Sequence, residues 1–439
     1  MIKKIFLIVI IPYFLLSQNF KKYYSINECI NTALKNNYSI KIYEAKIKGN
    51  EAKYRDVMTL QYPQLKLYGS YFRLSDIDPF QVTLPSPISK TIEISPVLLN
   101  NTNFKLSLQQ PIFTGGKISN SIDLAEHSYF SSLFSFSQEK NDLITNIKIA
   151  YYNILKAIKL LENVKENIIR TENHIKDLKH FLELGQITKN ELLKVEVQLY
   201  NLKSKEVEIN NILSLSKMSL NNLMGKDVNE EFDIDTTITD NIKINDLQFY
   251  LNEAIKKRPE ISMINESIKI AEYNKKITLS NWFPQLYLNA NYYYANPNQR
   301  IMPNKNKFID TWDVGISLSF DLWNWGSTSR KVEQSEALIE EAKSNLSLYT
   351  NMVILEVRQS YLNIIQLKEE LIHLNKSYEA AEENYRICKD KFQKGYLSST
   401  ELLDAEVALL TSKNNYINGL IDYNIAFFKL EKACGNINY

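Results

Sequence analysis

The chain has little of what would cross-link it or carry it through a membrane as a helix. Only three of its 439 residues are cysteine, Cys29, Cys388 and Cys434, an odd and scattered set. We therefore expect buried small residues at these positions rather than a disulfide framework. No stretch after residue 17 is continuously apolar for the roughly eighteen residues that a transmembrane helix needs. The sequence predicts no transmembrane helix.

Net charge and catalytic patterns are also weak. The formal net charge is only +2, so the chain has no basic field for nucleic acid or an acidic lipid surface. The residues 114–117, Thr-Gly-Gly-Lys, lack the rest of a phosphate loop and are interpreted as a turn. Neither an enzyme nor a cofactor or metal site is expected, because metal-ligand spacing is absent and helix-surface positions are predicted for the four histidines, His127, His174, His180 and His373.

The first seventeen residues have the pattern of a secretory signal peptide. Two lysines lie in residues 1–4, an apolar run fills residues 5–16, and Ser17 is a small residue suited to cleavage. The apolar run is too short to span a bilayer. No cysteine directly follows Ser17, which argues against a lipid-anchored N-terminus. We therefore expect residues 1–17 to be a signal peptide and the chain to be exported.

Glycine and proline are scarce, with eleven of each, and long stretches contain neither. Residues 117–184 are free of both, Gly185 closes them, and residues 186–224 are free of both again. If the first stretch is entirely helical, it is roughly 100 Å long at about 1.5 Å per residue. Its apolar residues follow more than one stripe, so we predict a rod that packs against more than one neighbour.

The same arrangement returns 210 residues later. Residues 327–394 lack glycine and proline, Gly395 ends them, and another helix is predicted from Tyr396 onward. A shift of 210 places Gly185 on Gly395 and residues 191–193 on residues 401–403 without a gap. The sequence therefore predicts an internal duplication, with repeats over residues 18–228 and 229–439.

Two short segments of alternating apolar and polar residues precede each long helix. They predict strands at about 64–74 and 103–113 in the first repeat and at about 285–295 and 311–323 in the second. Helices predicted over about 25–59 and 246–280 come before them, and a proline-bearing loop separates the first two strands.

Strands of about ten residues with one apolar face suit an outer-membrane β-barrel, because lipid on one side and water on the other demand a period of two. Four strands cannot close such a barrel, so the chain must pair with copies of itself or stay outside the membrane. Taken separately, the strands also fit a soluble antiparallel sheet, and the helices fit a soluble coiled coil.

The two helix ends form similar predicted tips, at about 183–191 and 393–404. Each begins with a glycine that supplies a left-handed turn, and Thr188 to Glu191 and Ser398 to Glu401 both match a capping box. In the last helix one apolar seam runs through Leu402, Leu409 and Leu430, and a second runs through Leu410 and Ile421. Two seams predict two neighbouring helices.

The segments 181–193 and 392–406 resemble the two helix-turn-helix tips of the outer membrane efflux proteins of the TolC type. The resemblance covers nearly the whole chain after residue 17. It implies a mixed α+β membrane protein that forms a homotrimer, with a twelve-stranded outer-membrane β-barrel, four strands per chain, continuous with a long periplasmic α-helical barrel.

The resemblance also implies a function. Such a protein is the outer-membrane exit duct of a tripartite efflux or type I secretion system, which passively exports small toxic molecules or proteins. Its implied partners are a periplasmic adaptor protein, an inner-membrane RND or ABC transporter and outer-membrane lipid, with no nucleic acid. A periplasmic coiled-coil scaffold without a channel is the alternative.

Residue roles at the tips follow from the resemblance as well. In the family the two turns contact the adaptor, which here assigns docking to Gly185, Gln186, Thr188, Gly395, Tyr396 and Ser398.

A gate at the periplasmic entrance is implied by residues six and nine positions after the second-tip glycine. Family members have aspartates there, and this chain has Glu401 and Asp404, which threefold symmetry would turn into two carboxylate rings. Phe392 and Leu397 occupy the positions where the best-known members hold the entrance shut with a tyrosine and an arginine. Neither of these two residues can form that hydrogen bond or ion pair.

Overall fold

The computed structural model describes residues 22–237 and 242–435, so the predicted signal peptide lies outside the described residues. The chain forms two compact units. Unit 1 contains the described residues of Met1–Lys41, Lys140–Lys257 and Leu355–Tyr439, and unit 2 contains Ile42–Glu139 and Arg258–Ile354. Each unit draws segments from both halves of the chain, because the longest helices begin in one unit and end in the other.

The two halves of the chain pass through helices of equal length in the same order. The pairs are α1 (Ile26–Asn36) with α5 (Leu247–Lys257), α2 (Tyr38–Met58) with α6 (Pro259–Leu279), α3 (Lys117–Glu183) with α7 (Ser327–Gln393), and α4 (Lys189–Leu223) with α8 (Ser399–Ala433). The pairs measure 11, 21, 67 and 35 residues. A single 3-10 turn follows α2 (Thr59–Gln61) and α6 (Ser280–Trp282).

Two helices predicted as continuous are each broken once. The segment predicted as helix over 25–59 divides at Asn37, whose backbone is extended and whose side-chain oxygen accepts a hydrogen bond from the Ser39 N–H at 2.7 Å. The segment predicted over 246–280 divides before Pro259, which is the first residue of α6. A proline has no N–H to donate to the preceding turn, so it can start a helix but not continue one without loss.

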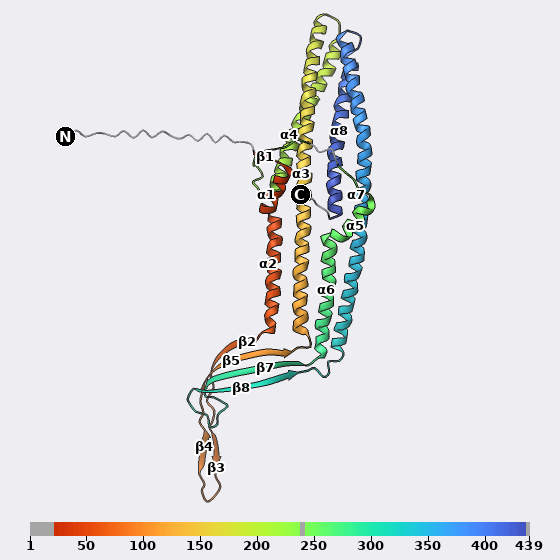
Figure 1. The fold of residues 1–439 in the computed structure, drawn as a ribbon. Helices are drawn as coiled ribbons and strands as arrows, with labels where there is room; N and C mark the ends of the chain where they lie inside the picture. The colour runs from red at the N-terminus through yellow and green to blue at the C-terminus, as the bar shows by residue number, and fades with distance from the viewer. Residues whose placement is uncertain (1–21, 238–241, 436–439) are drawn as a thin grey trace, which may run out of the picture. The chain divides into compact units, whose positions relative to one another are not determined.

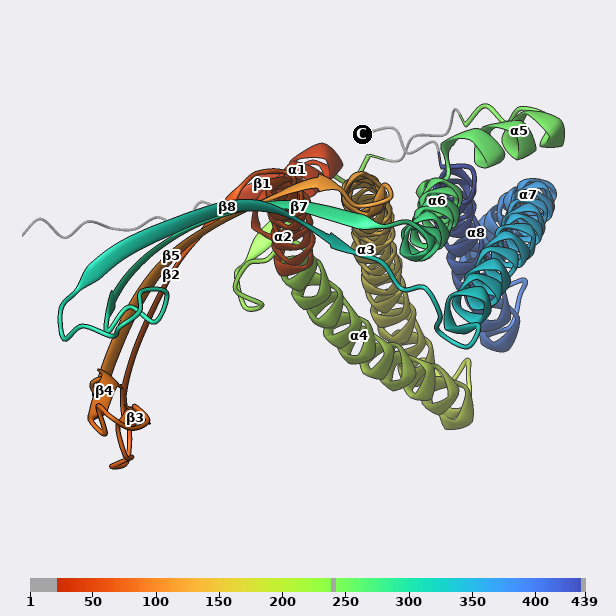
Figure 2. The ribbon, with the colours of Figure 1, turned by 90° about the horizontal axis from the view of Figure 1, so that it is seen from below.

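Unit 2 is built on a four-stranded antiparallel sheet in the order β2–β5–β7–β8 (Figure 1). Its strands are β2 (Gln64–Arg73), β5 (Asn100–Phe113), β7 (Gln285–Asn296) and β8 (Ile309–Ser319), and Figure 2 shows that they curve together. β5 begins three residues before the predicted segment, and β8 ends four residues before the end of its predicted segment. The pairing of β5 with β7 joins the two halves of the chain.

The register gives this sheet one apolar and one polar face. One row across the four strands is apolar and consists of Leu67, Leu106, Tyr292 and Trp312. The adjacent row points the other way and is polar, Lys66, Ser107, Asn291 and Asp313. The apolar row is open to solvent in the single chain, with Leu67 71% and Trp312 72% exposed. Among the described strands, β2 and β8 each have a partner on one side only.

The predicted loop after β2 contains a hairpin that the sequence reading missed. β3 (Phe80–Thr83) pairs antiparallel with β4 (Thr91–Ser95), and the hydroxyls of Thr83 and Thr91 lie 3.0 Å apart. In the same unit α6 lies between α3 and α7. A hydrogen bond of 2.6 Å between His127 and Glu266 and an ion pair of 2.8 Å between Lys275 and Glu336 mark these two contacts.

In unit 1 the four long helical segments contact one another in the series α4–α3–α8–α7. The three contacts are an ion pair of 2.9 Å between Lys203 and Glu172, an ion pair of 3.0 Å between Lys148 and Glu431, and stacked rings 5.9 Å apart on Tyr378 and Tyr416. In addition α4 contacts α8, and near the tips α3 contacts α7. A short parallel pair of strands, β1 (Lys22–Tyr24) and β6 (Phe232–Ile234), completes the unit. None of the described helices is long and apolar enough to cross a membrane.

Both predicted seams of α8 carry apolar contacts, with different burial. Leu402, Leu409 and Leu430 of the first seam are buried. In the second seam Ile421 is also fully buried within the chain, whereas Leu410 is only half-buried. Of the cysteines, Cys29 and Cys434 are buried as expected, and Cys388 is partly exposed.

Candidate docking and gate site at the helical tips

Both helical tips are closed by a glycine with a left-handed backbone. Gly185 has φ of +69° and Gly395 has φ of +76°. The N–H of Gln186 donates to the Phe181 carbonyl and the N–H of Tyr396 donates to the Lys391 carbonyl, each at 2.9 Å, as in a Schellman motif. A Cβ on either glycine would meet no atom within 4 Å. Glycine is therefore favoured here by backbone conformation and not by lack of space.

The helices that leave the two turns start differently. At α8 the Ser398 hydroxyl accepts the Glu401 N–H at 3.3 Å, and the Glu401 carboxylate accepts the Ser398 N–H at 3.0 Å, so the predicted capping box is present. At α4 the box predicted from Thr188 is wrong. The carbonyl of Thr188, rather than its hydroxyl, accepts the Glu191 N–H at 3.1 Å, and the Thr188 side chain makes no capping bond.

The two tips meet at one groove of about 600 Å³ within unit 1. Four of the six predicted docking residues line it: Gln186 from the first tip, and Gly395, Tyr396 and Ser398 from the second. Tyr396 is 81% exposed. Gly185 and Thr188 flank the lining residues Gln186 and Ile187 in sequence but are not among the residues that line the groove. The structure thus brings together residues from both tips that are 210 positions apart.

The residues at the two substituted gate positions, Phe392 and Leu397, also line the groove and belong to an apolar core. Phe392 is only 6% exposed and packs edge-to-face against His174 and Phe181, with ring centroids 5.1 and 5.8 Å away. Leu397 packs against the same cluster of buried residues. These two positions therefore stabilise the junction of the tips within one chain by apolar contact.

A buried polar group beside this core was missed from the sequence. His174 is 4% exposed, its Nε2 lies 3.3 Å from the Ser399 hydroxyl, and its Nδ1 lies 3.5 Å from a carboxylate oxygen of the buried Glu406. The expected surface position is thus wrong for His174. The spacing of the buried residues Val164, Thr171 and Leu178 would have placed residue 174 on the buried side of α3.

The other histidines divide in the same way. His127 is also largely buried, because its ring stacks on Tyr273 at 5.2 Å and its Nδ1 contacts Glu266. His180 and His373 are exposed, as predicted. In the part of the chain that the structure describes, no group of three or more His, Cys, Asp or Glu side chains is arranged to hold a metal ion.

Both predicted gate carboxylates are exposed near the start of α8. Hydrogen bonds from the Ser398 hydroxyl and backbone N–H hold the pKa of Glu401 below its usual range. Glu401 is therefore a fixed anion at the helix start. Asp404 lies one turn further along and forms no ion pair with another residue that the structure describes.

The sequence that forms these duplicated helices, two-faced strands and tips matches the model of a known protein family. The model described as outer membrane efflux protein matches residues 29–226 and 250–436. The chain belongs to the outer membrane efflux protein family. It is accordingly an outer-membrane exit channel of the kind that serves efflux or secretion, and the family is one of channels rather than of enzymes.

Relatives of this efflux protein come from several bacteria. Outer membrane protein TolC of Vibrio cholerae is 22% identical over 321 residues, 72% of this chain and 73% of that protein. The alkaline protease secretion protein AprF of Pseudomonas aeruginosa is 20% identical over 338 residues, 75% of this chain and 69% of that protein. At this identity, the names establish the family resemblance but no shared substrate.

Solved structures show the same fold. The CmeC outer membrane channel of Campylobacter jejuni superimposes with a TM-score of 0.77 at 17% identity, covering 94% of this chain and 85% of that one. The outer membrane protein VceC of Vibrio cholerae also gives a TM-score of 0.77 at 17% identity, covering 93% of this chain and 96% of that one.

Proposed function

We propose that three copies of this efflux protein form the exit duct of a tripartite efflux or type I secretion system. A twelve-stranded barrel spans the outer membrane and continues into a periplasmic α-helical barrel. The cargo is small toxic molecules or proteins. An inner-membrane RND or ABC transporter drives export, and a periplasmic adaptor links it to the duct.

The observation that carries this proposal is the open, two-faced sheet of unit 2. Its apolar face exposes Leu67, Trp312 and Ile316 to solvent in the single chain. Its edge strands β2 and β8 present unpaired backbone groups on their outer sides, within the described residues. In hydrocarbon each such group costs several kcal/mol, so an isolated sheet is unstable there. Joining β2 of one copy to β8 of the next removes every edge when the ring closes.

The number of copies follows from strand count together with the family resemblance. Outer-membrane barrels begin at about eight strands, so one copy is too few. The resemblance to TolC-type channels favours three. Residues 18–228 and 229–439 are then two repeats of a duplicated ancestor, which we infer from the equal helix lengths of the two halves.

The tips have two roles in the proposed duct: they bind the periplasmic adaptor, and they form the gate at the periplasmic entrance. The groove that contains Gln186, Tyr396 and Ser398 is the part of the adaptor-docking surface that the single chain already presents, and Gly185, Thr188 and Gly395 hold its backbone. Glu401 and Asp404 form carboxylate rings at the periplasmic entrance in the trimer. Such rings attract cations.

The experiment is expression of the full chain, membrane fractionation and reconstitution into planar bilayers. We expect an outer-membrane protein that is extracted only by detergent, runs as a trimer without heating and conducts ions in bilayers. The alternative is a coiled-coil scaffold, and the feature of the chain that supports it is the length of its two 67-residue helices. A water-soluble protein without conductance would support the scaffold and overturn the channel.

A further inference from the structure

A second groove lies on the polar face of the sheet in unit 2. Its volume is about 520 Å³, and it is lined by side chains of β2, β5 and β7. Two of them are lysines, Lys66 on β2 and Lys105 on β5. In the register Lys66 pairs with Ser107 and Lys105 with Tyr68, so the two lysines are diagonal neighbours on one face.

The floor of this groove is a fixed network of uncharged groups. In one row the Gln109 amide donates to Asn289 at 3.2 Å, and the Asn289 amide donates to the Ser317 hydroxyl at 2.9 Å. In the next row the Ser107 hydroxyl donates to Asn291 at 2.7 Å. Because these uncharged groups hydrogen-bond to one another, they hold the side chains of the polar face in fixed positions. The net charge of the groove therefore comes from the two lysines.

The only carboxylate on the polar face of the four described strands is already neutralised. Asp313 of β8 accepts the Asn291 amide at 2.7 Å and forms an ion pair with Arg300. Arg300 comes from the loop between β7 and β8, and its guanidinium carbon lies 4.1 Å from the centre of the Tyr293 ring.

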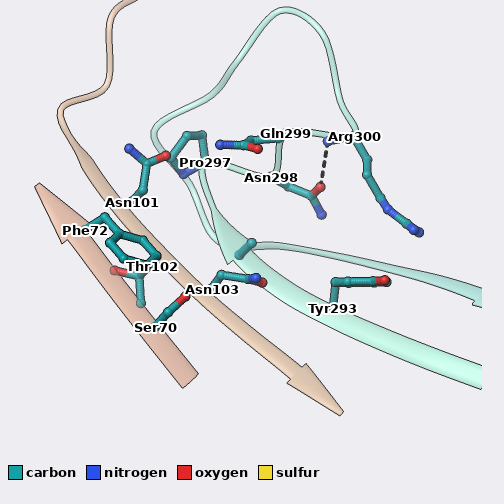
Figure 3. Close-up of a pocket in the computed structure, with 11 residues that line it drawn as sticks. Ser70, Phe72, Asn101, Thr102, Asn103, Tyr293, Pro297, Asn298, Gln299 and Arg300 are labelled. Atoms are coloured by element: carbon teal, nitrogen blue, oxygen red, sulfur yellow. Dashed lines mark hydrogen bonds between the residues drawn. The ribbon is translucent and has the colours of Figure 1, made fainter. Parts of the chain in front are cut away.

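Figure 3 shows this loop folded over the sheet, with Arg300 and Asn298 above Tyr293 and with the Arg300 N–H bonded to Asn298. Lys105 approaches the same Tyr293 ring at 5.4 Å. Neither Lys66 nor Lys105 forms an ion pair with a residue that the structure describes. The polar face thus carries three cations and one anion, an excess of two positive charges per chain.

We propose that the groove around Lys66 and Lys105 is an anion-binding site that favours exported substrates with carboxylate, sulfonate or phosphate groups. The inference rests on the proposed channel, in which the polar face of each sheet lines the barrel lumen. Three copies then place six lysines around the outer part of the duct. Rings of Lys or Arg select anions in pores, and an ammonium forms charge-assisted hydrogen bonds to anionic oxygens.

The test is block of single channels by naphthalene disulfonate, a large divalent anion, in bilayers of uncharged lipid. The anion is added on the side of the β7–β8 loops, so that it reaches the barrel before the entrance carboxylates. We expect the blocking constant of the wild type to weaken by roughly two- to fivefold in K66Q/K105Q, because the local potential that concentrates the anion is reduced.

Matched variants separate a site from a general charge effect. K66R/K105R keeps both charges and is expected to be blocked like the wild type. K90Q removes one lysine of the β3–β4 hairpin, outside the groove, so it is matched in charge to K105Q alone and is expected to leave block unchanged. If K66Q/K105Q does not assemble, K105Q alone is measured, since Lys105 lies on the inner strand β5 and is flanked by its chain's own strands.

The outcomes distinguish this inference from the proposed function. A wild type that does not conduct at all removes the channel, and the inference falls with it. A conducting wild type whose block is the same in K66Q/K105Q overturns the anion site and leaves the channel intact. Equal weakening in K90Q would also overturn the site, because the effect would then come from overall charge.

Discussion

A largely buried ion pair joins the two halves of the chain at the level of single residues. Lys148 of α3 and Glu431 of α8 are 3.0 Å apart, and their side chains are 10% and 13% exposed. Burial raises the pKa of Glu431, and the neighbouring Lys148 opposes that rise without cancelling it. Lys148 therefore does two things at this contact: it favours the ionised form of a largely buried carboxylate, and it holds α8 against α3.

Replacing Lys148 with methionine should destabilise unit 1 in a pH-dependent way. At neutral pH the variant leaves a buried carboxylate without its cation, and we expect a loss of about 2–3 kcal/mol in the free energy of unfolding. Without Lys148 the pKa of folded Glu431 rises further above its unfolded value. Protonation of Glu431 then stabilises the folded variant. This stabilisation is fully present below the pKa of Glu431 in the unfolded chain, and it is lost as the pH rises through the higher pKa of Glu431 in the folded chain.

Thermal unfolding measured at neutral pH and at about pH 5 checks this prediction. The difference between K148M and wild type should shrink at the lower pH, and K148M/E431Q should recover most of the loss at neutral pH. An equal loss at both pH values would assign the effect of Lys148 to packing, since its ammonium also lies 5.0 Å from the Phe428 ring.

Residue-scale prediction from sequence fails where a distant neighbour decides. It is right in most cases where a local interaction decides, although the equally local Thr188 box is absent. The left-handed glycines and the Ser398 capping box depend on a few consecutive residues, and both are present. His174 depends on Glu406 and Ser399, which are more than 200 positions away in sequence. A helix pattern shows which face is buried but not whether a buried histidine will find a partner there.

At the scale of helices, α4 and α8 allow a matched comparison because they have equal length and follow equivalent turns. Only α8 has a side chain that caps its first turn. We expect S398A to lower stability by about 1 kcal/mol, a typical value for loss of an N-cap hydroxyl, and T188A to change it by only a few tenths.

Hydrogen exchange of the amides at Glu401 and Glu191 measures the two caps separately. S398A should speed exchange in the first turn of α8, and T188A should leave the first turn of α4 unchanged. Acceleration at both sites to the same extent would mean that Thr188 caps α4 in solution, contrary to the structure.

The long helices are the elements most readily predicted, because residues 117–184 and 327–394 contain no residue that breaks a helix. The breaks at Asn37 and before Pro259 were missed. The Asn37 amide donates to the carbonyl of Leu223, 186 residues away, so a contact from another part of the chain helps hold that break. The pair β1–β6 was missed for the same kind of reason, since each strand has only three residues and their partners lie 210 positions apart.

At the scale of the whole molecule, the contact series α4–α3–α8–α7 of unit 1 has α4 and α7 at its two ends, which are called its edges here. Both edges expose large apolar side chains. On α4 these include Val197, Tyr200 and Val207, and on the unit 1 part of α7 they include Leu362 and Ile372. The three α4 residues lie three and seven positions apart, which is the spacing of one helix seam. Edges that expose different surfaces suit a head-to-tail ring, in which α4 of one copy packs on α7 of the next.

Disulfide cross-linking between these edges tests the ring directly. Val207 lies 22 residues past the tip glycine Gly185, and Ile372 lies 23 residues before Gly395. The two side chains are therefore at similar distances from the tips on helices that are neighbours in the proposed ring. In a C388S background, which removes the partly exposed native thiol, we expect V207C/I372C to form disulfides between copies and to give dimer and trimer bands on non-reducing gels.

The control V207C/E370C moves the second thiol by two residues, to an exposed position about 200° around α7, and it should not cross-link. Cross-linking of V207C/I372C within a single chain would require α4 and α7 of one copy to meet, which contradicts the helix order. Absence of any cross-link in detergent-extracted trimers would place these apolar stripes outside the contact between copies. In the proposed trimer the α4–α7 contacts between copies and the β2–β8 pairing close the same ring, so we expect loss of one to expose the edges of the other as well.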